Sequence, residues 1–188
     1  DNRPVLIAQL DAADKASDDE LIALAWLKWG EHSPEKLVGD FAFAIASPKT
    51  GVVFLARDVT GVKPLFYRVD EHGFFFANSA AAFKPLRLGT LTPSREWMAR
   101  FMLGISFQDV GTAYEELKKL PGSHCLLVHS DGRMNLRRYH RFNFDAPVER
   151  KRYPAWLQAY QAVWQEAVAC RMPEQGPIGS ENSGGLDS

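Results

Sequence analysis

The chain ends on a stretch whose residue types suit the binding of an anion. Its last six residues read SGGLDS, so two adjacent glycines stand between Ser183 and the residues Asp187 and Ser188. Glycine permits positive φ and a close approach of the backbone, so successive N–H groups can converge on phosphate oxygens. Such a cradle normally leads into a helix N-terminus, whose free N–H groups add to the attraction. A Gly/Ser-rich surface tail is the alternative interpretation.

The remaining chemistry-bearing residues show no ligand or catalytic spacing. The histidines are scattered along the sequence: His32, His72, His124, His129 and His140. Metal sites and general bases normally need closer or patterned spacing, so we predict no metal site. Cys125 and Cys170 share no motif, and isolated thiols fit a reducing compartment better than a disulfide framework. We expect both cysteines to be small packed apolar residues.

Length and composition limit the class of protein. With 188 residues, the chain can hold one domain, or one domain and part of another. Hydrophobic residues make up 46% and charged residues 24%, which is ordinary for a globular protein. The net charge of -1 gives no basic surplus for nucleic acid. No apolar run has the roughly 18 residues that a membrane helix needs, and the start DNRPVL is no signal peptide. We expect a cytoplasmic protein without nucleic-acid or membrane partners.

A helix is predicted over residues 16–30, ASDDELIALAWLKWG. Ser17 and Glu20 have the spacing of a capping box, and Asp18 and Asp19 complement the positive end of the helix dipole. Gly30 is a plausible end of the helix. One stripe of apolar side chains gives it a face to bury: Ile22, Ala25, Trp26 and Trp29.

Strands follow the helix. Residues 41–47, FAFAIAS, alternate bulky and small apolar side chains, which favours a strand covered on both sides. Three further strands complete an antiparallel meander, at 52–58, 65–70 and 74–78. A mostly helical region from Ala80 to Leu120 has its clearest helix at 93–104, and a hairpin over 124–140 turns at Ser130-Asp131-Gly132. Near residue 146 the composition becomes polar and charged, which indicates a linker, and 155–172 is then an amphipathic helix.

Five stretches, in order along the chain, resemble the asparagine synthetase family. They are SDDELIAL (17–24), GDFAFA (39–44), ARDVTGVKPLFY (56–67), LPGSHCLLVHSDGRMNLRRYHRF (120–142) and the terminal SGGLDS. The resemblance implies an α+β fold for residues 1–145: a class II glutamine amidotransferase domain, which is an N-terminal nucleophile hydrolase with an αββα sandwich, truncated at its N-terminus. Residues 146–188 would be a linker, a helix and the pyrophosphate loop that opens an α/β ATP pyrophosphatase domain.

In this family, a cysteine at position one releases ammonia from glutamine, and ATP adenylates a carboxylate such as that of aspartate. The implied cofactors are ATP and Mg²⁺, the implied substrates are small molecules, and homodimers are usual. A carboxylate becomes a good electrophile only when its oxygen can leave, and a glycine-rich backbone cradle can stabilise the departing pyrophosphate. The resemblance thus implies an amide-forming ligase.

The resemblance assigns roles to six residues. The pyrophosphate would be surrounded by Ser183, Gly184, Gly185, Asp187 and Ser188. The Asp187 carboxylate would cap the following helix or bind magnesium indirectly, and repulsion from phosphate favours the cap. Asp18 matches the aspartate that receives the α-amino group of glutamine. The alternative for Asp18 is a purely dipole-complementing role, although Asp19 could fill that role alone.

Arg57 and Asp58 are adjacent charged residues that resemble an active-site pair. A buried Arg–Asp pair that steadies the end of a strand is the interpretation we favour.

The sequence departs from the family pattern in several places. The first residue is Asp1, whereas the hydrolase chemistry needs a free N-terminal Cys, Ser or Thr. The family's Arg-containing glutamine-binding segment and its Asn-Gly-Glu segment are also missing. We therefore expect a fragment that begins inside one domain, ends inside another and is inactive alone, with no catalytic nucleophile of its own. Residues 77–86, ANSAAAFKPL, lack the acidic and basic residues usual there.

Two alternatives stay open at this stage. Divergent relatives such as β-lactam synthetases and lasso-peptide cyclases lose glutaminase activity and form an intramolecular amide. A non-catalytic scaffold that retains the sandwich is the other alternative, and the intact SGGLDS stretch argues against it.

Overall fold

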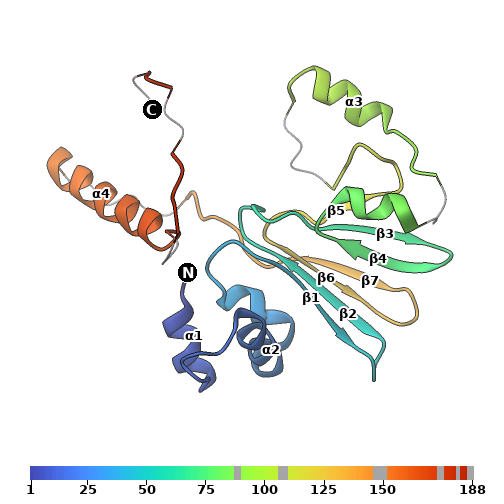
Figure 1. The fold of residues 1–188 in the computed structure, drawn as a ribbon, viewed down its shortest axis with the longest axis horizontal. Coiled ribbons are helices and arrows are strands. Elements are labelled where there is room, and N and C mark those ends of the chain that lie inside the picture. The colour runs from blue at the N-terminus through green and yellow to red at the C-terminus, as the bar shows by residue number, and fades with distance from the viewer. Residues whose placement is uncertain (87–89, 106–109, 146–151, 173–175, 181–182, 186–188) are drawn as a thin grey trace. The chain divides into compact units, whose positions relative to one another are not determined.

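The computed structural model describes residues 1–86, 90–105, 110–145, 152–172, 176–180 and 183–185. The chain divides into two compact units (Figure 1). One unit comprises residues 2–142, and the other comprises residues 143–188 together with Asp1.

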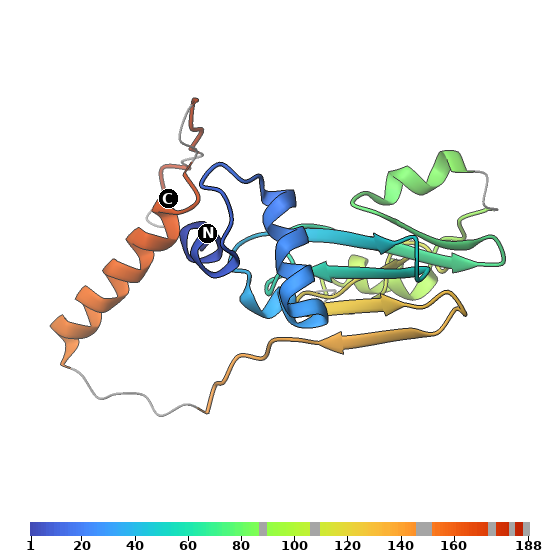
Figure 2. The same ribbon diagram turned by 90° about the horizontal axis from the view of Figure 1, so that it is seen from below.

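The larger unit contains two antiparallel sheets (Figures 1 and 2). Sheet A has four strands in the order β1-β2-β6-β7: Ala42–Ser47, Val52–Arg57, His124–Val128 and Met134–Arg138. Sheet B has three strands in the order β4-β3-β5: Gly73–Ala77, Phe66–Asp70 and Lys118–Lys119. The register pairs Leu55 of β2 with Ala44 of β1 and with Leu126 of β6. β2 is therefore hydrogen bonded along both of its edges.

Helices α1 (Arg3–Leu10) and α2 (Asp18–Trp29) cover one face of sheet A (Figure 1). The predicted apolar stripe of α2 is confirmed, because Ala25 is fully buried and the ring centroid of Trp26 lies 4.6 Å from that of Phe54. Alternate residues of β1, β2 and β6 face these helices. Together with one residue of α1 and one that follows the 3₁₀ helix η1 (Gly30–Lys36), they form the first core: Leu6, Leu37, Phe43, Phe54, Ala56, Cys125 and Leu127.

The opposite face of sheet A packs against sheet B. The intervening residues of β2 and β6 point to this side and meet side chains from the second sheet. This second core consists of Leu55, Leu65, Tyr67, Leu120, Leu126 and Val128. Because neighbours such as Phe54 and Leu55 are both fully buried on opposite faces, β2 belongs to both cores.

A short 3₁₀ helix, η2 (Ala80–Leu86), follows β4 on the side of sheet B that faces away from sheet A (Figure 1). It buries Phe83. Helix α3 (Arg95–Met102) comes next in the chain, and Ser94 caps it by accepting a hydrogen bond from the backbone N–H of Trp97 at 3.5 Å. Helices, two stacked sheets and a further helical segment thus follow one another in layers. The predicted α+β sandwich of αββα type is confirmed.

The prediction that 41–47 is covered on both sides is wrong. Phe43 of β1 is buried against the helices, whereas Ala44 and Ala46 on the other face are exposed. β1 lies at the edge of sheet A, and the inter-sheet core is built on its neighbour β2 and on the next strand, β6. The apolar alternation was therefore a sign of one packed face and one face of small residues.

Two of the elements that lie outside the predicted pattern are short. The segment from Gly30 to Lys36 forms a 3₁₀ helix, η1, directly after the predicted helix end, where Gly30 takes φ +55°. The two-residue strand β5, Lys118–Lys119, falls within the region that was predicted to be mostly helical. It pairs with Phe66 and Tyr67 of β3. Neither element has an apolar periodicity of its own, so tertiary context decides both.

The smaller unit contains helix α4 (Tyr153–Ala169), which confirms the predicted amphipathic helix with a start two residues earlier. The rings of Tyr160 and Trp164 stack one turn apart, with centroids 6.0 Å apart. In the described part of the chain, no helix combines the length and the apolar character that crossing a membrane requires.

Candidate functional site

Asp18 is the first residue of α2, and its position is set by the capping box predicted from the sequence. The Ser17 hydroxyl accepts a hydrogen bond from the backbone N–H of Glu20 at 3.2 Å, and the Glu20 carboxylate accepts one from the Ser17 N–H at 2.6 Å. These bonds satisfy free N–H groups of the first turn and hold the helix start in place. The capping is complete without Asp18, so its carboxylate is available for another partner.

That partner within the chain is Arg3. Its Nη1 donates a hydrogen bond to Oδ1 of Asp18 at 2.6 Å, and its Nη2 donates to the carbonyl oxygen of Ala16. The Asp18 side chain remains 88% exposed and that of Arg3 39% exposed. Among the residues that the structure describes, no donor contacts the second carboxylate oxygen of Asp18. Asp18 is therefore oriented at one oxygen and open to solvent at the other.

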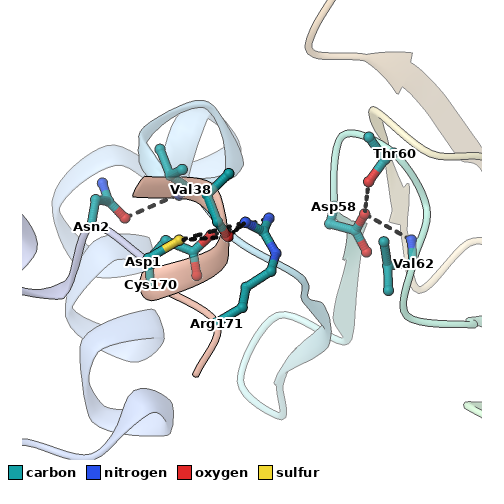
Figure 3. A network of polar contacts seen from close by, with 9 residues as sticks. Asp1, Asn2, Val38, Asp58, Thr60, Val62, Cys170 and Arg171 are labelled. Carbon is teal, nitrogen blue, oxygen red and sulfur yellow. Dashed lines mark hydrogen bonds and ion pairs between the residues drawn. The ribbon is translucent and has the colours of Figure 1, made fainter. Parts of the chain in front are cut away.

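Asn2 fixes the same end of α1 to another segment (Figure 3). Its side-chain amide donates to the carbonyl oxygen of Lys36 at 2.9 Å and accepts from the backbone N–H of Val38 at 3.0 Å. Consecutive side chains, Asn2 and Arg3, thus tie the start of α1 to the end of η1 and to the start of α2. Neither residue was predicted to matter. The only sequence signal was the polar DNR start, whose partners lie 13 or more residues away.

Arg57 and Asp58 are both buried at the end of β2, as predicted. They stabilise the strand end through separate hydrogen bonds to the neighbouring loops, and their side chains, which the structure describes, do not bond to each other. The Asp58 carboxylate accepts hydrogen bonds from the N–H groups of Val62 at 2.9 Å and Lys63 at 3.0 Å, and from the hydroxyl of Thr60 at 3.2 Å (Figure 3). It therefore shapes the loop over residues 58–63 by satisfying that loop's backbone donors.

The Arg57 guanidinium binds backbone carbonyls, and no ion pair joins it to Asp58 in the described chain. It donates to Lys63 at 2.6 Å, to Leu120 at 2.7 Å and to Gly61. Burial lowers the pKa of Arg57, and the negative charge of Asp58 partly opposes this shift. The guanidinium thus joins two loops, 58–63 and 120–123, at the same end of the sandwich.

Further bonds close this junction. Ser123, at φ +61°, donates its hydroxyl to the carbonyl of Val59 at 2.8 Å and its N–H to that of Asp58 at 2.9 Å. The hydroxyl of Tyr139 donates to the carbonyl of Arg57 at 2.6 Å. Each polar side chain named here has a hydrogen-bond partner within the protein, so the described cluster forms a structural junction.

The terminal glycine pair lies in the smaller unit, and only part of it is described. Gly184 takes φ +73°, and the N–H of Gly185 donates to the Ser183 hydroxyl at 3.4 Å. Apart from its chain neighbours, no described atom lies within 4 Å of the position of a Cβ at Gly184. Backbone N–H groups and a hydroxyl are donors that suit phosphate oxygens. Asp187 and Ser188 lie outside the described residues, and the pyrophosphate role of all five residues stays a prediction.

The thiols differ from each other in environment. Cys125 is buried in the first core, where burial raises the pKa of its thiol, while the charge of Arg137 works in the opposite direction. Cys170 is exposed at the end of α4, so the expectation that both cysteines are packed is wrong for Cys170, since that helix face has no covering segment in the described chain. Across the described ranges, no group of three or more His, Cys, Asp or Glu side chains is arranged to hold a metal ion.

Comparison with known proteins relates this fold to a family. The sequence profile of the glutamine amidotransferase domain matches residues 3–140, which is most of the chain. The chain belongs to this family. The two stacked antiparallel sheets and their helices lie within the matched range, which agrees with the N-terminal nucleophile hydrolase sandwich expected for such a domain.

Curated relatives of this amidotransferase chain include two asparagine synthetases (glutamine-hydrolysing) of Bacillus subtilis strain 168. Number 3 is 28% identical over 189 residues, covering 100% of this chain and 30% of the relative. Number 1 is 30% identical over 175 residues, covering 92% of this chain and 27% of the relative. The chain therefore spans about a third or less of the length of these relatives.

Among solved structures, the glutamine phosphoribosylpyrophosphate amidotransferase of Bacillus subtilis, complexed with ADP and GMP, is similar over 74% of this chain and 27% of its own, with a TM-score of 0.49 and 18% identity.

Proposed function

We propose that residues 2–142 form the glutamine-binding part of an amidotransferase that releases ammonia from glutamine, and that Asp18 accepts the α-ammonium group of that glutamine. The observation that carries the proposal is the accessible carboxylate of Asp18 within a chain that matches the glutamine amidotransferase domain over residues 3–140. A carboxylate with one free oxygen is a suitable acceptor for an ammonium group, and hydrogen bonds between charged groups are the stronger ones.

No residue of this chain is assigned as the nucleophile. Cys125 is 2% exposed and has a raised thiol pKa, which opposes formation of the reactive thiolate. The proposal therefore concerns substrate binding by this chain, and it assigns no residue to the bond-breaking step.

The proposal extends to amide formation with ATP, as in the asparagine synthetases that the chain resembles. Ser183, Gly184 and Gly185 would contribute hydroxyl and backbone donors to the pyrophosphate, with Asp187 and Ser188 beside them. ATP would activate the acceptor carboxylate, and Mg²⁺ would neutralise the phosphate charge. Aspartate is the acceptor that the relatives' names suggest, and a homodimer is the assembly that the resemblance suggests.

The test uses the full-length gene product and measures glutamate released from L-glutamine. An Asp18→Asn variant keeps the shape of the side chain and removes its charge. We expect its KM for glutamine to rise about 10- to 100-fold with kcat little changed, since a hydrogen bond to a charged group contributes about 1.5–3 kcal/mol and about 1.4 kcal/mol is a factor of ten.

Asp19→Asn is the matched control. Asp19 is exposed in the same first turn of α2, so this substitution removes the same interaction with the helix dipole. Equal effects of the two substitutions on KM would mean that Asp18 only complements the dipole. A wild-type protein that consumes ATP in the presence of Mg²⁺ but releases no glutamate would instead favour the intramolecular amide-forming relatives.

A further inference from the structure

We infer that Arg3 is a positioning residue for the Asp18 carboxylate, so that affinity for glutamine depends on a side chain that does not touch the substrate. This inference rests on the proposed role of Asp18 and adds to it a second residue from a different helix.

The geometry assigns the role to Arg3 because its guanidinium is held at two points. Nη1 donates to Oδ1 of Asp18 at 2.6 Å, while Nη2 donates to the carbonyl of Ala16, which is itself buried. A planar guanidinium that is fixed at one nitrogen has little freedom at the other. Through Ala16, the orientation of Asp18 is thus set by the backbone of the loop that precedes α2.

The backbone segment that carries Arg3 is also fixed. The neighbouring residue Asn2 bonds to the backbone of Lys36 and to that of Val38, and Figure 3 shows the bond to Val38. Leu6, one turn later in α1, is buried in the first core. The segment that carries Arg3 is therefore anchored both by polar contacts and by packing, and it can hold an otherwise exposed carboxylate in one rotamer.

Because the Asp18 side chain is exposed, only a hydrogen-bond partner such as Arg3 can restrain its rotamer. At 88% exposure, packing restrains its side chain very little, and an unrestrained carboxylate loses rotamer freedom when it binds a ligand. The Arg3 contact occupies Oδ1 and leaves Oδ2 without a donor among the described residues. Arg3 thereby removes part of the ordering cost before glutamine arrives, which is the usual benefit of preorganisation.

The experiment is a double-mutant cycle on the full-length gene product, with KM for L-glutamine and kcat as readouts. Arg3→Met keeps an unbranched side chain and removes the guanidinium. We expect KM to rise about fivefold with kcat unchanged, a size in keeping with an exposed ion pair. In the Asp18→Asn background, the same substitution should have no further effect, because Arg3 acts only through Asp18. Arg3→Lys should fall between wild type and Arg3→Met, because an ammonium cannot reach both acceptors.

Arg133→Met is the control, because Arg133 also forms an exposed ion pair of similar length, with Asp131 at 2.7 Å on the turn between β6 and β7. It should leave KM unchanged, and its melting temperature should match that of Arg3→Met. A KM effect of Arg3→Met that persists in the Asp18→Asn background, or one explained by a lower melting temperature, would overturn the inference. Asp18→Asn raising KM while Arg3→Met does not would overturn it and leave the proposed function standing. Absence of any glutamine binding by the wild type would reject both.

Discussion

At the scale of single residues, three polar side chains at the end of β2 act on the backbone. Asp58 binds N–H groups, Arg57 binds carbonyls, and the hydroxyl of Tyr139 completes the set by donating to the Arg57 carbonyl. A buried carbonyl left without a donor costs about 1–3 kcal/mol. The removal of one such hydroxyl should therefore be measurable in the stability of the whole unit.

Replacing Tyr139 by Phe should lower the free energy of unfolding by about 1–2 kcal/mol at neutral pH, because the Arg57 carbonyl loses its donor. Burial and the charge of Asp58 raise the pKa of Tyr139 above its usual value. A raised folded-state pKa contributes stability that is complete below the unfolded pKa of about 10 and is lost as pH rises further. The wild type should therefore lose stability above about pH 10, and the variant should lose less. Urea titrations at a series of pH values measure both effects.

The matched control is Tyr160→Phe, since Tyr160 is 62% exposed on α4. A Tyr139→Phe protein as stable as this control at pH 7 would show that the hydroxyl bond contributes nothing.

At the scale of elements, two loops support each other where strands end. A Cβ at Gly122 would lie 2.9 Å from the backbone nitrogen of Gly61, 3.0 Å from the carbonyl carbon of Thr60 and 3.0 Å from the carbonyl oxygen of Val59. All three are backbone atoms, so the contact cannot be relieved by a side-chain rotation. The close approach of loops 58–63 and 120–123 therefore requires glycine at position 122.

Gly122→Ala should lower the free energy of unfolding by about 1–3 kcal/mol through this overlap. Thermal and urea unfolding measure it. Gly179→Ala serves as control, because nothing lies within 4 Å of the position of its Cβ. Equal stability of the two variants would mean that the two loops separate at little cost.

Sequence patterns predicted some elements well and others poorly, and the difference has a physical basis. The capping box at Ser17 and the apolar stripe of α2 are local signals, and both were confirmed. The alternation in 41–47 predicted a strand, but it could not tell an edge strand from a central one, because that depends on which segments pair with it. β5 consists of two lysines, so only its hydrogen bonds to β3 define it.

In the candidate site too, the local feature was predicted and the long-range contacts were not. The position of Asp18 in the first helical turn followed from the residues around it. Its contact with Arg3 crosses 15 positions of sequence and the whole loop between two helices, so no local pattern could indicate it. The same holds for Arg57, whose partner Leu120 lies 63 positions further along.

At the scale of the whole unit, β2 connects two cores. Phe54 faces α2 and Leu55 faces sheet B, and each is fully buried. Since the two cores share this strand, we expect residues 2–142 to unfold as one cooperative unit.

The variants Phe54→Ala and Leu55→Ala test this expectation. Each should lower the free energy of unfolding by about 2–5 kcal/mol, which is typical when a large buried side chain is truncated. Tryptophan fluorescence from a protein in which Trp26, beside Phe54, is the only tryptophan kept of the five, and far-UV circular dichroism should give coincident transitions in both variants. Val69→Ala, at a half-exposed position of β3, should cost far less. If Leu55→Ala shifted the circular dichroism transition and left the fluorescence transition in place, the two cores would be independent.

The position of β7 at the end of this unit bears on how the protein is made. Arg137 bonds to Glu35 across 102 positions, and Tyr139 bonds to Arg57 across 82. β7 also completes sheet A beside β6. During synthesis on the ribosome, the helices and the first four strands emerge long before these partners exist, so their packing must wait for about the hundredth later residue. Until β6 is made, the nascent chain exposes the edge of β2 that β6 later covers, and a chaperone would have most to protect in this interval.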